Sequence, residues 1–213
     1  MKQGSVLITC LFILWSWSGK AQSLKTVIQN GHLSVIKTVA HTPDGNYILT
    51  GSRDKTIKLW EVATGREMRT FFGHENTVND IAVDQSGKLF VSSSADGKAI
   101  LWDVLTGERL KEFDMKGDYL TAVDLSTYGR WLVTAGFDYK AYLWDLHTGD
   151  TLRSFKVNPD KGLGYGISAA FSTNNKIVYF GNDNSTITAY DVENGTLLFE
   201  YERLRGSCGG CAS

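Results

Sequence analysis

The chain has 213 residues but few of the side chains that build catalytic or metal sites, since it contains only four histidines and three cysteines. It also lacks a nucleophile elbow, a phosphate-binding loop and a metal-binding helix motif. Its aspartates and glutamates are spread over separate predicted strands and turns, so the sequence does not demand a carboxylate pair. We therefore expect a protein that is not an enzyme and that binds no cofactor and no metal.

Long hydrophobic runs are also scarce. A single run, from Val6 to Trp17, follows Lys2 and precedes Gly19-Lys20-Ala21, which has small residues at the two positions that a signal peptidase recognises. Residues 1–21 are therefore predicted to be a secretory signal peptide, and the product is expected in the periplasm or secreted. The run is shorter than the roughly 20 residues that a membrane-spanning helix needs, so no membrane span is expected after the leader is removed.

An excess of basic residues is absent as well. The chain contains 22 lysines and arginines and 23 aspartates and glutamates, for a formal net charge of −1 at pH 7. Cleavage after Ala21 would remove the two positive charges of Lys2 and Lys20 and no acidic residue, which gives −3. Because phosphate binding needs a basic surface, nucleic acid is not expected as a partner.

Cleavage would also remove Cys10 and leave Cys208 and Cys211, in an irregular tail rich in glycine at residues 203–213. In an oxidising compartment two cysteines so close together could form a disulfide or act as a redox couple. The tail offers no helix start that would activate a thiol, and no second pair of ligands is spaced for zinc. Whether the two cysteines pair stays open, and a redox protein is a minor alternative.

The strongest feature that the sequence does contain is a repeat. Four segments end alike, and their aromatic marker recurs after 42, 42 and 46 residues: Ile57–Glu61, Ala99–Asp103, Ala141–Asp145 and Thr188–Asp191. Two series of turn residues keep the same spacing: Gly45, Gly87, Gly129 and Asn175, and Gly65, Gly107, Gly149 and Gly195. The four extra residues of the last repeat are expected in a connector at residues 157–165. Each repeat is predicted to contain four short strands, for example at 35–39, 47–52, 56–61 and 67–72.

This period predicts an all-β protein, a β-propeller of four-stranded antiparallel blades. Residues 22–202 are expected to form four blades in a partial ring, with a leading strand and the following bounds: strand 24–29, then blades 31–72, 73–114, 115–156 and 157–202. A single blade cannot bury both of its faces, so stacking of successive blades supplies the core.

The residues at these positions resemble the WD-repeat family of β-propellers, over about residues 24 to 202. The family's glycine–histidine pair, its turn aspartate and its tryptophan match the following residues: Gly31-His32 and Gly73-His74, then Asp54, Asp96 and Asp138, then Trp60, Trp102 and Trp144. In the family these groups and a strand hydroxyl form a buried hydrogen-bonded set, so the resemblance implies structural roles for them. In the first blade the hydroxyl is either Thr50 or Ser52.

The later repeats depart from the family pattern. Residues 116–118, Lys-Gly-Asp, stand where the histidine pair is expected in the third blade. In the fourth blade Asn184 replaces the turn aspartate and Tyr190 replaces the tryptophan. We therefore expect blade four to be the least well ordered of the four blades.

Propellers usually bind through the face where the loops between second and third strands meet the connectors between blades. On that face we expect the protein-binding residues to be Arg53, Lys55, Glu75, Asp118, Tyr119, Phe137, Tyr139 and Tyr165. Exposed tyrosine, phenylalanine and arginine are typical of binding hot spots, although each of these residues could instead pack its loop against a neighbouring blade.

The two ends of the repeat array compete for one sheet edge. In the family a leading strand completes the last blade, but here the last blade has its own fourth strand, at residues 196–201. Either further blades follow in a longer parent protein, or two copies associate through their open ends. The chain is thus expected to be a protein-binding or peptide-binding scaffold. The alternative is the targeting portion of a larger exported, peptidase-like hydrolase, which the family resemblance alone suggests.

Overall fold

The computed structural model describes residues 31–115, 119–157, 166–183 and 185–201. Within these ranges the chain forms strands and turns, arranged as four sheets of four antiparallel strands each. Blade one consists of β1 (Ile36–His41), β2 (Tyr47–Ser52), β3 (Ile57–Glu61) and β4 (Arg66–Phe71). Blade two consists of β5 (Val78–Val83), β6 (Leu89–Ser94), β7 (Lys98–Asp103) and β8 (Arg109–Asp114).

The remaining two sheets repeat this order of neighbouring strands. Blade three consists of β9 (Leu120–Leu125), β10 (Trp131–Gly136), β11 (Lys140–Asp145) and β12 (Thr151–Lys156). Blade four consists of β13 (Gly166–Phe171), β14 (Ile177–Asn182), β15 (Ile187–Asp191) and β16 (Leu197–Tyr201). The prediction of an all-β propeller with four four-stranded blades is therefore confirmed, and the strands of the first repeat lie within two residues of their expected bounds.

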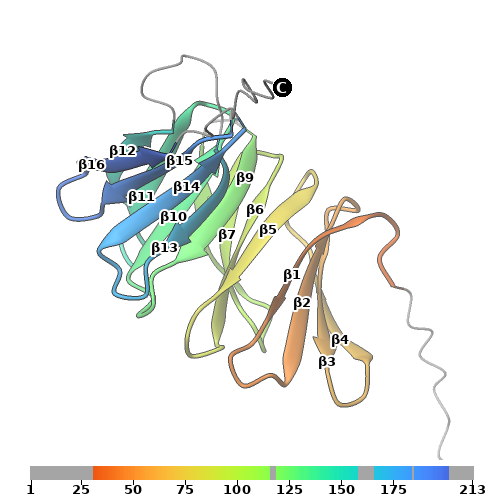
Figure 1. The fold of residues 1–213 in the computed structure, drawn as a ribbon. Helices are drawn as coiled ribbons and strands as arrows, with labels where there is room; N and C mark the ends of the chain where they lie inside the picture. The colour runs from red at the N-terminus through yellow and green to blue at the C-terminus, as the bar shows by residue number, and fades with distance from the viewer. Residues whose placement is uncertain (1–30, 116–118, 158–165, 184, 202–213) are drawn as a thin grey trace, which may run out of the picture.

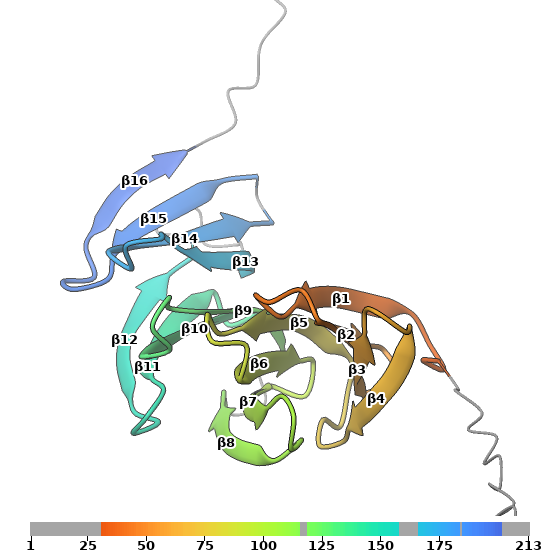
Figure 2. The same ribbon diagram turned by 90° about the horizontal axis from the view of Figure 1, so that it is seen from below.

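The four blades follow one another along an open arc (Figures 1 and 2). The first strand of each blade contacts the first strand of the next, so β1, β5, β9 and β13 line the inner side of the arc. The predicted signal peptide (1–21), leading strand (24–29), tail (203–213) and most of the connector 157–165 lie outside the described residues. No helix long and apolar enough to cross a membrane occurs in the described part of the chain.

The hydrophobic core consists of three clusters, one at each junction between successive blades. Alternate residues of a strand point to opposite faces of its sheet. Phe90 of blade two therefore joins the cluster shared with blade one, whereas the next residue, Val91, joins the cluster shared with blade three. Both side chains have no exposed surface. Each blade is thus stabilised on both faces only where it has two neighbours.

The face of blade one that points away from blade two has no neighbouring blade among the described residues, and its apolar side chains are exposed. Ile36 and Val39 are 51% and 68% exposed, whereas the residues at the same positions of blade two, Val78 and Ile81, are 0% and 6% exposed. This apolar face is uncovered among the described residues. Association of two copies through such ends stays a prediction.

The turns that join first and second strands adopt the conformation that the spacing predicts. Gly45, Gly87 and Gly129 have φ angles of 71°, 69° and 62°, and Asn175 at the fourth position has a φ of 58°. Asparagine tolerates this left-handed region better than other residues with a side chain. The substitution of glycine by asparagine therefore keeps the same tight hairpin in blade four.

A buried hydrogen-bonded set fixes blade one, as the family resemblance implies. Nε2 of His32 lies 2.8 Å from Oγ1 of Thr50, and its Nδ1 lies 2.9 Å from Oδ2 of Asp54. Nε1 of Trp60 donates to the same Thr50 hydroxyl at 2.8 Å. The hydroxyl of the set is thus Thr50, whereas Ser52 accepts a hydrogen bond from the main-chain N–H of Asp54.

Blade two repeats this set with a serine. His74 lies 2.8 Å from Oγ of Ser92 and 2.9 Å from Asp96, and Nε1 of Trp102 donates to Ser92 at 2.9 Å. His74 and Ser92 are both buried. The structural roles implied for the histidine, aspartate and tryptophan of the first two blades agree with these contacts.

The later blades are held by substitutes. In blade three Trp144 donates to Thr134 at 3.0 Å, and the hydroxyl of Tyr142 donates to Asp138 at 2.7 Å. Tyr142 thus contacts the turn aspartate that histidine contacts in the first two blades. In blade four the hydroxyl of Tyr190 donates to the main-chain carbonyl of Lys156 in blade three. Residues 116–118 and Asn184 lie outside the described residues.

Candidate functional site

The loops between second and third strands and the connectors between blades lie at the same end of the blades, toward the top of Figure 1. Six of the eight predicted binding residues are described there: Arg53, Lys55, Glu75, Tyr119, Phe137 and Tyr139. Asp118 and Tyr165 lie outside the described residues. These six residues come from blade one, the β4–β5 connector and blade three.

The structure brings together the aromatic residues of blade three. The rings of Tyr119 and Phe137 are stacked, with centroids 4.6 Å apart and an interplanar angle of 22°. Their side chains are nevertheless 37% and 41% exposed, and Tyr139, two residues further along the same loop, is 46% exposed. We call Tyr119, Phe137 and Tyr139 the aromatic patch.

Main-chain contacts hold the aromatic patch in place. The N–H of Phe137 donates to the carbonyl of Tyr119 at 3.0 Å, which joins the loop of one strand pair to the connector that enters the blade. Gly136 makes this approach possible, because a Cβ at that position would lie 2.5 Å from the Tyr119 carbonyl oxygen. Tyr139 has a φ of 62°, which is uncommon for a residue with a bulky side chain. The patch is therefore presented by a constrained loop.

The charged residues predicted with this patch are placed elsewhere. Arg53 and Lys55 lie in the β2–β3 loop of blade one, and the main-chain N–H of Arg53 donates to the Val35 carbonyl at 2.9 Å. Glu75 lies in the β4–β5 connector, where its N–H donates to Asp96 at 2.8 Å. All three have exposed side chains, but they belong to blade one and its connector rather than to the aromatic patch.

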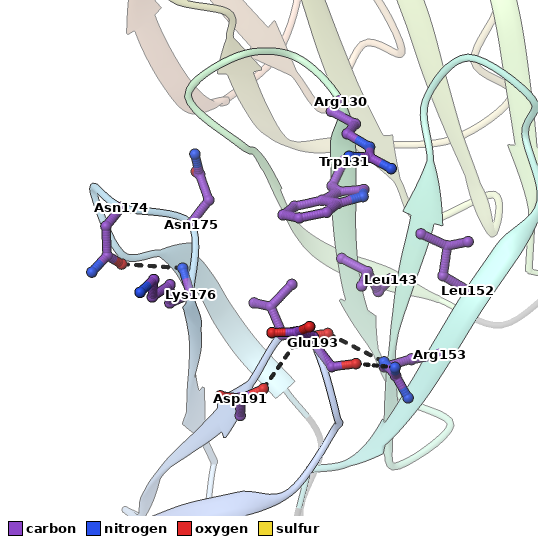
Figure 3. Close-up of a pocket in the computed structure, with 11 residues that line it drawn as sticks. Arg130, Trp131, Leu143, Leu152, Arg153, Asn174, Asn175, Lys176, Asp191 and Glu193 are labelled. Atoms are coloured by element: carbon purple, nitrogen blue, oxygen red, sulfur yellow. Dashed lines mark hydrogen bonds between the residues drawn. The ribbon is translucent and has the colours of Figure 1, made fainter.

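A cavity of about 670 Å³ between blades three and four is a second candidate site, which sequence reasoning missed (Figure 3). One wall holds Arg130 and Trp131 at the start of β10, and the other holds the turn of Asn174, Asn175 and Lys176. Leu143, Leu152, Arg153, Asp191, Val192 and Glu193 complete the lining. We call it the inter-blade cavity. It opens among the turns at the end of the blades opposite to the aromatic patch.

Hydrogen bonds between the two blades fix the walls of the inter-blade cavity. Arg153 of β12 donates from Nε to the Val192 carbonyl at 3.2 Å and from Nη2 to the Glu193 carbonyl. On the inner side, the N–H of Thr127 donates to Oδ1 of Asn175 at 2.9 Å. These hydrogen bonds hold the turns that line the cavity in place.

Two partly buried carboxylates join the inner strands of neighbouring blades. Asp80 on β5 accepts hydrogen bonds from the Val123 N–H at 3.2 Å and from the Thr38 hydroxyl at 3.3 Å, so it contacts both neighbouring blades. Asp124 on β9 accepts from the Phe171 N–H at 2.6 Å. Burial raises the pKa of both carboxyl groups, against the lowering effect of these hydrogen bonds, and the charge of Asp80 further raises the pKa of Asp124.

In the part of the chain that the structure describes, no group of three or more histidines, cysteines, aspartates or glutamates is arranged to hold a metal ion. Cys208 and Cys211 lie outside that part. The described residues thus form a rigid array of repeats, with the aromatic patch at one end of the blades and the inter-blade cavity at the other. Such platforms present surfaces for other macromolecules.

Comparison with known proteins agrees with this class. The family model of the WD domain, G-beta repeat, matches residues 22–61, 65–103 and 107–145, which together make up more than half of the chain. The chain therefore belongs to the WD40 repeat family. Domains of this family generally act as non-catalytic scaffolds for protein partners.

Individual relatives match over a short stretch. A protein named ribosome biogenesis protein BOP1 homolog, from Drosophila ananassae, is 44% identical over 48 residues, which cover 22% of this chain and 6% of that protein. The protein of the same name from Drosophila erecta is 42% identical over a stretch of the same length and coverage. The chain thus matches only a small part of the length of these curated relatives.

Proposed function

We propose that this chain is a non-catalytic scaffold, exported from the cytoplasm, that binds a protein or peptide through the aromatic patch of blade three. The observation that carries the proposal is the stacking of Tyr119 on Phe137 at 4.6 Å while both rings stay more than one third exposed. Export is supported by the leader pattern of residues 1–21.

The aromatic patch presents apolar surface that is already ordered before a partner binds. Each exposed ring can bury a large apolar area on binding, and aromatic residues are enriched among binding hot spots. Because the Phe137 N–H is already bonded to the Tyr119 carbonyl, little loop entropy is lost when a partner binds. The side-chain hydroxyl of Tyr119, which donates to Asn79 at 3.4 Å, further restricts that ring.

The experiment compares a patch variant with a control from the same blade. The Tyr119→Ala/Phe137→Ala/Tyr139→Ala variant and a Tyr128→Ala control are expressed in the native cells, and cross-linked partners are quantified by mass spectrometry. Tyr128 is 86% exposed in the turn at the opposite end of blade three. The control variant therefore removes an exposed aromatic ring but leaves the aromatic patch intact.

The patch variant should lose at least one partner that the wild type and the control retain, with an unchanged melting temperature. Equal partner profiles for all three proteins would overturn the proposal. A lower melting temperature of the patch variant, with equal loss of every partner, would show that the rings serve packing instead.

A further inference from the structure

The inter-blade cavity is lined by hydrogen-bond donors that have no acceptor among the described residues. The indole N–H of Trp131 makes no hydrogen bond there, although an indole nitrogen can only donate. The other three tryptophans that the structure describes all donate to a hydroxyl of their own blade: Trp60, Trp102 and Trp144. Trp131 thus differs from them in having a donor available to a ligand.

Two cations share the lining of this cavity. The guanidinium of Arg130 lies 5.1 Å from the centroid of the Trp131 ring, and Lys176 lies on the opposite wall (Figure 3). Neither side chain lies within ion-pair distance of a described carboxylate, although the charge of Arg130 also acts on the Asp145 carboxylate and lowers its pKa. A carboxylate placed between the walls would accept charge-assisted hydrogen bonds from these groups.

The other charged groups of the cavity are largely occupied by its own turns. Arg153 donates to main-chain carbonyls of the β15–β16 turn, and Oδ1 of Asp191 accepts from the N–H groups of Glu193 and Asn194 at 2.9 Å each. Counting every charged residue of the lining, three cations face two acids, which leaves one positive charge. A ligand with one negative charge therefore balances the charges of the lining, whereas a phosphate dianion would leave one negative charge in excess.

The rest of the lining suits a peptide. Leu143, Leu152 and Val192 provide an apolar surface next to the side-chain amides of Asn174 and Asn175. The volume of about 670 Å³ lies within the range of pockets that enclose small ligands or a few side chains. We propose that the inter-blade cavity binds a short segment of a partner protein that carries one carboxylate beside an apolar side chain. This site is separate from the aromatic patch and does not depend on it.

The test uses the full chain and a synthetic peptide array as the probe. The array displays seven-residue peptides with a central Asp or Glu, flanked by every pairing of Leu, Val, Phe, Tyr and Trp, and a matched array carries Asn or Gln at the centre. The wild-type protein should bind members of the acidic array, and the amide counterparts of those peptides should bind about tenfold more weakly, as expected for the loss of a charge-assisted contact. Equal binding to both arrays, or no binding to the acidic array, would overturn the proposal.

Variants assign the binding to the cavity. Arg130→Gln and Lys176→Gln should each weaken the best acidic peptide about tenfold, whereas the control Lys88→Gln removes a charge at the same position of blade two and should leave affinity unchanged. Trp131→Phe keeps an aromatic ring but removes the N–H and should also weaken binding without a large change in melting temperature. Equal effects of Arg130→Gln and Lys88→Gln would show that only the overall charge of the protein matters, and would overturn the assignment.

Discussion

Arg153 of blade three and Val192 of blade four are joined by a hydrogen bond of 3.2 Å from the guanidinium Nε to the main-chain carbonyl. The contact belongs to a series, because Lys111, 42 residues earlier, donates from Nζ to the His147 carbonyl of the following blade. Arg69, another 42 residues earlier, lies against Gly107 of blade two. A basic residue on the fourth strand thus contacts the β3–β4-type turn of the next blade at all three junctions.

Substitution of Arg153 should loosen the junction between blades three and four. Arg153→Met keeps the apolar stem but leaves the turn carbonyls of residues 192–194 without their donor, so the free energy of unfolding should fall by about 1 kcal/mol. Urea unfolding followed by tryptophan fluorescence measures the change. Arg66→Met is the control, because Arg66 is exposed at the start of β4 and is expected to change stability by less than about 0.5 kcal/mol. If the two variants lose the same stability, the contact is not stabilising.

Ser92 should be among the most sensitive polar positions of blade two. Ser92→Ala leaves His74 and Trp102 without the hydroxyl that both contact, at a site with no solvent exposure, and should cost about 2 kcal/mol or more. Ser92→Thr restores the hydroxyl and should retain most of the stability, since threonine occupies this position in blades one and three. Chemical denaturation measures the free energy of unfolding of both variants. If Ser92→Thr loses as much stability as Ser92→Ala, the volume of the side chain matters more than its hydroxyl.

Asp54 should make folding depend on acid pH. Burial opposes its charge, but hydrogen bonds from Thr56, the Leu33 N–H and His32 outweigh burial and lower the pKa of the Asp54 carboxyl from 3.8 to about 2. Because the folded state holds the proton less tightly than the unfolded state, this group stabilises the protein above pH 3.8, and the contribution is lost as pH falls toward 2. The stability difference between wild type and Asp54→Asn should therefore shrink between pH 5 and pH 3. A constant difference would contradict this prediction.

Asp80 should show the opposite pH dependence. Burial raises the pKa of its carboxyl above 3.8, so the folded state holds the proton more tightly than the unfolded state. The stability that Asp80 contributes is therefore greatest below pH 3.8 and declines as pH rises through the raised pKa. The free energy of unfolding of wild type minus that of Asp80→Asn should fall between pH 3.5 and pH 6 in matched urea titrations. A rising difference would mean that the N–H and hydroxyl donors around Asp80 outweigh its burial.

The fold could be predicted from the sequence because each blade repeats local signals. Turn residues such as Gly45 and Gly87 recur at fixed spacing, and the strands between them alternate apolar and polar residues. The partner of a side chain was harder to predict. Thr50 and Ser52 point to the same face of β2, and only the position of the His32 and Trp60 rings distinguishes them.

The sequence predicted the residues of the aromatic patch but not the inter-blade cavity, for a physical reason. Tyr119 and Phe137 come from one blade, so the repeat pattern already places both at the same end of it. The inter-blade cavity joins Trp131 to Lys176 and Glu193, whose proximity depends on how two blades pack. One signal was available, since Trp131 is an aromatic residue outside the family's tryptophan position. The recurrence of Arg69, Lys111 and Arg153 every 42 residues was another.

Strand β10 begins at Trp131 and ends at Gly136, the residue before Phe137. Its six residues, at about 3.3 Å each, hold the inter-blade cavity and the aromatic patch roughly 20 Å apart. Because β10 is paired with β9 on one side and β11 on the other, the distance between its two ends is fixed. One ligand in the inter-blade cavity and another on the aromatic patch could therefore bind at the same time. A single partner that binds both sites would need a linker long enough to reach around the edge of the molecule. Linker length would then set its avidity.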